Sequence, residues 1–233
     1  MTILGIVGGI APESTIVYYR LLVDGYRSRV PDAYPEILIN SINLTRLLSL
    51  VGAGDRPGLI AYLGTEIQRL ADAGAGLAFM ASNTPHLVFD DVQARSPIPL
   101  VSIVEATADR AASLGFTRLG LLGTRYTMEG TSYSSVMERR GIAVQTPDSG
   151  DRDYVHRVYL GEVALGIFKP ETRDGLLAVI HRLHGAGAQA VILGGTELPL
   201  LLNDTVQSPV PLLDTTRLHA EAVLRRLLPE AAG

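Results

Sequence analysis

Short apolar runs alternate with longer stretches of helical periodicity along the whole chain. Ile3–Val7 and Leu119–Leu122 are typical runs, continuous, aliphatic and followed by glycine. Such runs indicate strands buried on both faces of a parallel sheet, and the amphipathic stretches between them indicate covering helices. The predicted strands are Ile3–Val7, Ile37–Ile42, Leu77–Ala81, Leu100–Val101, Leu119–Leu122, Ile142–Val144, Ala190–Leu193 and Leu212–Leu213. The predicted helices are Ser14–Tyr26, Gly58–Ala73, Ile103–Leu114, Tyr133–Arg140, Gly175–His184 and Arg217–Leu228.

Three pairs of segments recur in the same order, which indicates an internal duplication. Leu4–Gly9 resembles Leu119–Thr124, Gly74–Asp91 resembles Gly187–Asp204, and Ser96–Val101 resembles Ser208–Leu213. We therefore expect an α/β fold of two similar duplicated domains, each with a parallel sheet, and a cleft between them. The predicted first domain comprises residues 1–100 plus about 212–233, because the last strand and helix are expected to return to pack beside it or to bridge both domains, and the second comprises 101–211.

Four loops follow the predicted strands at the ends where ligands usually bind. In open parallel sheets, helix N-termini and free loop amides converge beyond the carboxyl ends of the strands. The candidate loops are Gly8–Thr15, Ser82–His86, Gly123–Gly130 and Gly194–Glu197. If the duplicated halves face each other, all four loops meet at one cleft.

Composition and charge narrow the possible functions. Apolar residues make up 47% of the chain and aromatic residues 6%, which suits a sheet covered by helices. The formal charge of -4 arises without a block of one sign, so the chain lacks the basic footprint of a nucleic-acid binder. No apolar run approaches the ~20 residues that a membrane helix needs, and no leader pattern opens the chain, so we expect a cytoplasmic protein without membrane contact. Cysteine is absent, which excludes disulfides and thiol chemistry.

The first loop indicates a pocket for an anion or a carboxylate. It reads GGIAPEST from Gly8, with glycines for a tight turn, a proline suited to a first helical turn, and the Ser14 and Thr15 hydroxyls, which are expected to supplement the free backbone amides. The dinucleotide spacing G-x-G-x-x-G and the P-loop lysine are both missing. Gly9 and Ile10 are the candidate ligand contacts, and a purely structural turn is the alternative.

The loop SNTPH after the third predicted strand has the most side chains that can bind a ligand or exchange a proton with it. Asn83 and Thr84 can donate hydrogen bonds to a carboxylate, and His86 can exchange a proton. The alternative is that Asn83 and Thr84 cap a helix and that His86 is a satisfied buried group. The repeat superposes Ser82 on Gly195, Asn83 on Thr196 and Thr84 on Glu197, so a polar loop stands at the equivalent place in each half.

Taken in order, four motifs resemble those of the aspartate/glutamate racemase superfamily, the cofactor-independent amino-acid racemases. They are GGIAPEST, SNTPH, LGT with Thr127 downstream, and LGGTELPLLL. The resemblance implies an isomerase that acts on a small carboxylate or amino acid, without a cofactor, as a homodimer. It implies that the substrate contacts are Gly9, Ile10, Asn83, Thr84, Thr124, Thr127 and Thr196.

The chain departs from this superfamily at the catalytic pair. The resemblance places the two family cysteines at Ser82 and Gly195, and neither residue can act as a thiol. Inversion needs a base on one face of the substrate and an acid on the other, so the usual two-thiol racemisation is not expected. The remaining catalytic candidates are Ser82, Gly195, Thr84, His86 and Glu197. The missing side chain at Gly195 predicts open space there, able to hold a water molecule or a larger substituent.

Three explanations of this departure stay open. The protein catalyses another reaction in the same cleft, as superfamily decarboxylases, other lyases and cis-trans isomerases do with one cysteine. It is a carboxylate-binding protein without turnover. Alternatively, Ser82 replaces a natural cysteine.

Three cationic residues and two histidines outside these loops are further candidates for function. Arg46 and Arg56 follow the second predicted strand, where Arg can meet a second substrate carboxylate, and surface exposure is the alternative. Lys169 resembles a family lysine that contacts a distal carboxylate, and solvent exposure is the alternative. His181 and His184 lie three apart on a predicted helix but lack a third ligand nearby, so no metal site is expected.

Overall fold

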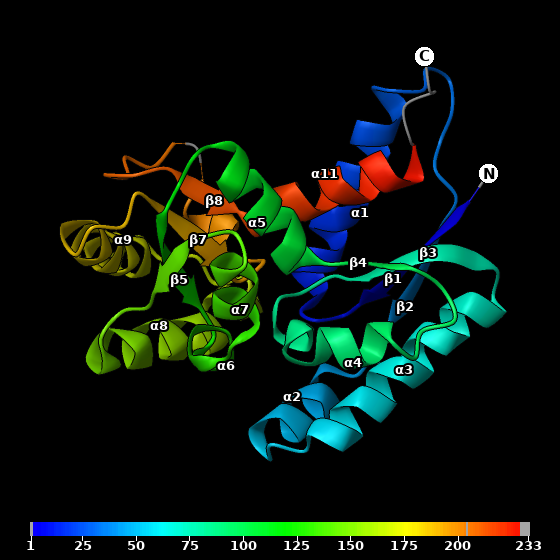
Figure 1. The fold of residues 1–233 in the computed structure, drawn as a ribbon, viewed down its shortest axis with the longest axis horizontal. Helices are drawn as coiled ribbons and strands as arrows, with labels where there is room; N and C mark the ends of the chain where they lie inside the picture. Colours follow the sequence, from blue (N-terminus) through cyan, green and yellow to red (C-terminus); the bar gives the residue numbers. More distant parts are fainter. Residues whose placement is uncertain (1, 204, 229–233) are drawn as a thin grey trace. The chain divides into compact units, whose positions relative to one another are not determined.

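The computed structural model describes residues 2–203 and 205–228 of the chain. Asp204, which ends the second repeated segment, and residues 1 and 229–233 of the predicted first domain lie outside the described residues. The chain forms two compact α/β units, shown in Figure 1. Unit 1 runs to Ile103 and resumes at Thr216, and unit 2 is Val104–Thr215.

The sheet of unit 1 has four parallel strands in the order β2-β1-β3-β4. They are β1 (Ile3–Gly8), β2 (Ile37–Ser41), β3 (Ala75–Met80) and β4 (Leu100–Val101). The central strands β1 and β3 are almost wholly buried, as their continuous apolar runs predict. Because β1 and β3 are parallel neighbours, the loops that follow them lie at the same edge of the sheet.

Helices cover both faces of this sheet. On one face, α2 (Leu44–Gly52), α3 (Arg56–Asp72) and α4 (Phe89–Gln93) share an apolar core with the strands. On the other face, α1 (Pro12–Arg27) and α11 (Thr215–Leu227) lie side by side, as Figure 1 shows. The Tyr18 hydroxyl lies 2.8 Å from Nδ1 of His219, which joins α1 to α11 inside this layer. The C-terminal helix is therefore an integral part of the first core.

Unit 2 repeats the same topology, with strand order β6-β5-β7-β8. Its strands are β5 (Arg118–Gly123), β6 (Ala143–Gln145), β7 (Ala190–Gly194) and β8 (Leu212–Asp214). Its helical elements are α5 (Ile103–Ser113), α6 (Arg125–Glu129), α7 (Ser132–Glu138), α8 (Ser149–Gly161), η2 (Val163–Leu165), α9 (Pro170–Gly185) and α10 (Leu198–Leu201). Two four-stranded parallel sheets of equivalent order confirm the predicted α/β fold of two similar units. No helix in the described part of the chain is long and apolar enough to cross a membrane.

All eight predicted strands form, but two expectations about the organisation need correction. The last strand, β8, pairs with β7 and so belongs to unit 2, whereas the sequence placed it in the first domain. Only α11 returns to unit 1. The sequence also missed α2 and α8, whose N-terminal caps are Asn43 and Asp148; these side chains accept hydrogen bonds from the amides of Arg46 and Asp151. Such cap residues also favour ordinary turns, so they do not by themselves predict a helix.

Candidate functional site

The turn after β1 is held by its own glycines and hydroxyls. Gly9 has φ +80, and a Cβ there would lie 2.7 Å from Ser41 Oγ and 2.8 Å from the Ile42 carbonyl oxygen. Only glycine fits this close approach in the left-handed region. The Gly9 amide donates to Thr15 Oγ1 at 2.9 Å. The expected role of Gly9 as an amide donor to an anion is therefore weakened, because a ligand would have to share or displace this bond.

Ser14 ties this turn to the loop after β3. Its hydroxyl lies 2.8 Å from the Ala11 carbonyl oxygen and 3.2 Å from that of Ala81, and the Ala81 amide donates to the carbonyl of Val7 in β1. The two predicted loops of unit 1 are thus neighbours at one sheet edge. The Ser14 hydroxyl is committed to this link, so it does not supplement the loop amides as the sequence suggested.

The loop after β3 brings Ser82, Asn83 and Thr84 together at a largely buried position. Their exposed fractions are 6%, 4% and 6%. Asn83 is the N-terminal cap position of the short helix η1 (Thr84–Val88), although its side chain makes no capping bond there. Among the described residues, the hydroxyls of Ser82 and Thr84 make no hydrogen bond. No side-chain oxygen in that part of the chain is both fully buried and unpartnered, so these two hydroxyls keep a path to solvent. They are the groups of unit 1 best placed to receive a ligand.

His86 is fixed in one neutral form by two backbone groups. The amide of Ile103 donates to Nε2 at 3.2 Å, so the ring proton lies on Nδ1, which donates to the Ser82 carbonyl oxygen at 2.9 Å. Burial and the neighbouring His219 lower the pKa of His86 from 6.5 to about 3. Since both ring nitrogens are engaged, the predicted role of His86 in proton exchange is not supported by this geometry. Its contacts suit the alternative of a satisfied buried group that positions the Ser82 backbone.

In unit 2, the hydroxyls of Thr124 and Thr127 lie close together in the loop after β5. Thr124 caps α6, its Oγ1 accepting from the Thr127 amide at 3.2 Å, and the two side-chain oxygens lie 3.1 Å apart. Both residues are buried. The glycines Gly123 and Gly194 let β5 and β7 approach closely here, because a Cβ on Gly123 would lie 2.5 Å from the Gly194 carbonyl oxygen. Thr124 and Thr127 are thus brought together as predicted, with part of their hydrogen-bonding capacity used within the pair.

The loop after β7 contains a buried carboxylate and a tyrosine that the sequence did not indicate. Thr196 and Glu197 are each 1% exposed, and Thr196 Oγ1 donates to Glu197 Oε2 at 3.1 Å. Tyr159, on α8, donates its hydroxyl to the same carboxylate oxygen in a short hydrogen bond. The expected open space at Gly195 is absent, because a Cβ built there would lie 2.4 Å from Cε2 of Tyr159. The tyrosine ring fills that position.

The predicted cations do not join these loops through described contacts. The Arg46 guanidinium stacks over the Tyr62 ring, 4.4 Å from its centroid. Arg56 pairs with Asp91 at 2.5 Å. Lys169 Nζ lies 3.1 Å from Glu162 Oε1 at an exposed site. Partly exposed pairs of this kind contribute about 0–1 kcal/mol each, so the surface alternative describes Arg56 and Lys169 best.

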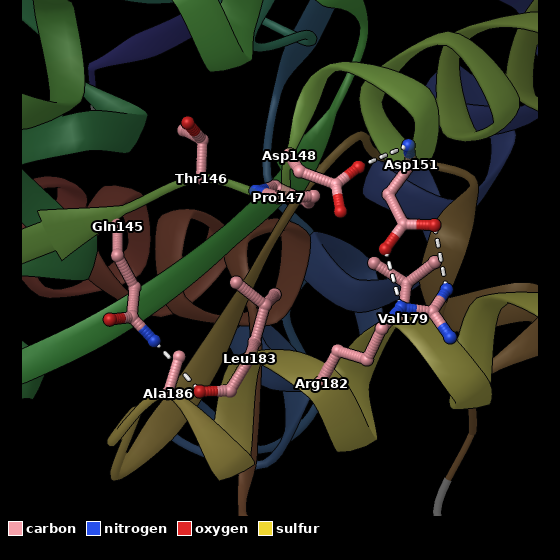
Figure 2. A pocket seen from close by; sticks show the side chains of 9 residues that line it. All are labelled: Gln145, Thr146, Pro147, Asp148, Asp151, Val179, Arg182, Leu183 and Ala186. Atoms are coloured by element: carbon pink, nitrogen blue, oxygen red, sulfur yellow. Dashed lines mark hydrogen bonds and ion pairs between the residues drawn. The ribbon is translucent and has the colours of Figure 1, made fainter.

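One described pocket lies away from every predicted site residue. It has a volume of about 230 Å³, in unit 2, at the end of the edge strand β6. Figure 2 shows Arg182 paired with both carboxylate oxygens of Asp151, each at 2.6 Å, and Gln145 donating to the Leu183 carbonyl. Its charged groups thus satisfy one another. The residues described contain no cluster of three or more potential metal ligands, and His181 and His184 lie on an exposed stretch of α9.

The sequence did not indicate two residues that contact the strand ends, namely Tyr159 and His219. It indicated the Ser14 hydroxyl but not its carbonyl partners. Tyr159 lies 36 positions before Gly195 in a helix that was not predicted. No local pattern links them, so only the folded chain shows their contact.

Comparisons with known proteins agree with this architecture. The family model described as Asp/Glu/Hydantoin racemase matches residues 7–223. A candidate Asp/Glu racemase from Yersinia pestis is 37% identical, with a TM-score of 0.88 over 98% of this chain and 100% of that one. An aspartate racemase homologue from Pyrococcus horikoshii is 33% identical, with a TM-score of 0.81 over 99% and 100%. The broad specificity amino-acid racemase RacX of Bacillus subtilis is 22% identical over 97% of this chain and 98% of its own. The chain belongs to the Asp/Glu/hydantoin racemase family.

Proposed function

We propose that this protein is a racemase-like isomerase that binds a small carboxylate, such as an acidic amino acid, and acts on its α-carbon without a cofactor or a thiol pair. The observation that carries the proposal is the Ser82–Thr84 loop. It presents two hydroxyls without partners among the described residues, at the carboxyl end of a central strand. Such hydroxyls suit a carboxylate, and a hydrogen bond to a charged group contributes about 1.5–3 kcal/mol.

Family membership and the names of the relatives support the substrate class. Relatives of the chain include the glutamate racemase from Koribacter versatilis and the broad specificity amino-acid racemase RacX. Both names describe reactions at the α-carbon of amino acids. The chain itself lacks cysteine, so its proton transfers cannot follow a two-thiol course.

A carboxylate-binding protein without turnover is the second candidate. It is favoured by one observation, the engagement of both His86 nitrogens by backbone groups. In unit 1 this leaves the loop after β3 with hydroxyls and an amide but no ionisable base, and an α-proton is removed only by a base of suitable pKa.

One experiment separates the two candidates. The protein is incubated in heavy water with L- and D-aspartate and L- and D-glutamate; NMR measures deuterium at the α-carbon, and calorimetry measures binding. Exchange supports the isomerase, and binding without exchange supports the binder. Absence of both across the four amino acids contradicts the proposal.

Site variants place the ligand. Thr84→Val removes one hydroxyl at nearly constant volume, and we expect about a 10- to 100-fold weaker affinity because a charge-assisted hydrogen bond is lost. Thr65→Val on the exposed face of α3 is the control and should leave affinity unchanged. Equal affinities of both variants and the parent would place the ligand away from the Ser82–Thr84 loop.

A further inference from the structure

Gly195 and Tyr159 form a matched pair in unit 2. Gly195 directly follows β7 and is the repeat equivalent of Ser82, which lies two residues after the end of β3 in unit 1. A Cβ on Gly195 would lie 2.4 Å from Cε2, 2.9 Å from Cζ and 3.0 Å from the hydroxyl oxygen of Tyr159. Real Cβ atoms do not approach carbon so closely, so the ring and any side chain at position 195 exclude each other.

The backbone does not require glycine at position 195. Gly195 is not among the described glycines with positive φ, which include Gly9, Gly166 and Gly187. An L-residue could adopt its conformation without strain. The obstacle to a side chain is therefore the Tyr159 ring.

Tyr159 is held in this place by hydrogen bonds. It is 6% exposed on α8, and its hydroxyl donates to the Glu197 carboxylate, which also accepts from Thr196. Burial, the charge of Glu197 and the hydrogen bond to it raise the pKa of Tyr159 well above 10. The phenol thus stays protonated at neutral pH and is a poor proton donor to a substrate.

We propose that Tyr159 takes the place of the side chain that Gly195 lacks and determines the specificity of the unit 2 loop, so that a ligand there meets a fixed phenol edge. The inference rests on the proposed function, and it adds that position 195 of this loop offers a phenol edge in place of an acid/base side chain. Tyr159 is a positioning residue in this scheme.

The steric half of the proposal is tested by unfolding, without a substrate. Gly195→Ala is made in three backgrounds: the parent, Tyr159→Phe and Tyr159→Ala. We expect the added methyl group to lower the urea midpoint in the parent and equally in the Phe background, because the ring remains. In the Ala background, it should leave the midpoint unchanged or raise it. Equal effects in all three backgrounds would overturn the proposal.

Gly64→Ala controls for glycine replacement as such. A Cβ on Gly64, within α3, meets nothing within 4 Å, and alanine favours a helix. We expect this variant to raise the midpoint. Should Tyr159→Ala not fold, Tyr159→Leu serves as the ring-free background, with the same expected relief of the Gly195→Ala penalty.

The chemical half is tested with the four amino acids in heavy water. We expect Tyr159→Phe to raise KM several-fold while kcat for exchange changes less than about threefold. A 100-fold loss of kcat in Tyr159→Phe at constant KM would overturn the proposal. Absence of exchange with every amino acid counts against the proposed isomerase, and the unfolding comparison then decides the role of Tyr159 alone.

Discussion

The two buried histidines of unit 1 should make the protein sensitive to mild acid. His86 is 3% exposed and His219 0% exposed. Burial is the main cause that lowers the pKa of each from 6.5, to about 3 for His86 and about 4 for His219. The unfolded chain therefore binds protons that the folded chain does not. The stability that depends on the neutral rings is present above pH 6.5 and is lost as the pH falls toward 4 and then 3.

The size of this effect follows from proton linkage. At pH 5 an unfolded histidine with a pKa of about 6.5 is 1.5 units below its midpoint, which corresponds to about 2 kcal/mol, while the folded rings remain mostly neutral. The two rings together should lower the free energy of unfolding by about 4 kcal/mol between pH 7.5 and pH 5. This is a large share of the ~5–15 kcal/mol by which typical domains are stable.

Urea unfolding at pH 7.5 and pH 5 measures this loss, and native-state hydrogen exchange of β1 amides reports unit 1 separately. His219→Gln offers an amide donor for the Val101 carbonyl and an acceptor for Tyr18, which are the present partners of His219, and removes one titrating group. We expect the variant to lose only about half as much stability over this pH range. The exposed His181→Gln controls for the replacement itself and should change the free energy of unfolding at pH 7.5 by less than about 0.5 kcal/mol.

The stability loss between the two pH values is compared for each variant. A substitution that only destabilises the protein lowers the free energy of unfolding equally at both pH values, whereas removal of a titrating ring changes the loss between them. A loss below about 1 kcal/mol between the two pH values would refute the reasoning, and so would an undiminished loss in His219→Gln. NMR gives an independent check, because the ring signals of His86 and His219 should not titrate between pH 5 and pH 8.

Two further predictions concern the strand ends of unit 1, each measured as the free energy of unfolding in urea. Ser14→Ala should cost about 1–3 kcal/mol, because two carbonyls lose a buried donor, whereas Ser28→Ala, at an exposed hydroxyl, should change stability by less than about 0.5 kcal/mol. Equal effects would show that the Ser14 link does not stabilise the loops. Gly9→Ala should lower the free energy of unfolding more than Gly54→Ala. Both glycines have positive φ, which costs alanine about 1–2 kcal/mol, but only at Gly9 would the added Cβ also lie close to Ile42 and other atoms. Comparable costs would argue against the tight turn.

The sequence determined the architecture because its information there is local. The buried strands are apolar runs, followed by glycine in three of the four predicted central strands, and the repeated segments, such as Leu4–Gly9 and Leu119–Thr124, are similar because they build equivalent strands. The polar loops at the strand ends could be named for the same reason, since a parallel sheet brings the carboxyl ends of its strands to one edge. The fold and the candidate loops were thus within reach of the sequence alone.

Only the tertiary structure decided which polar groups in those loops remain free to act. The sequence made His86 a candidate for proton exchange. In the fold, its two ring nitrogens are hydrogen-bonded to the Ile103 amide and the Ser82 carbonyl. The missing side chain of Gly195 predicted open space, but the ring of Tyr159 occupies that position. In both cases a deciding contact comes from a residue outside the loop, Ile103 for His86 and Tyr159 for Gly195. Hydrogen bonds and excluded volume act through space, and the order of residues does not record which distant groups will meet.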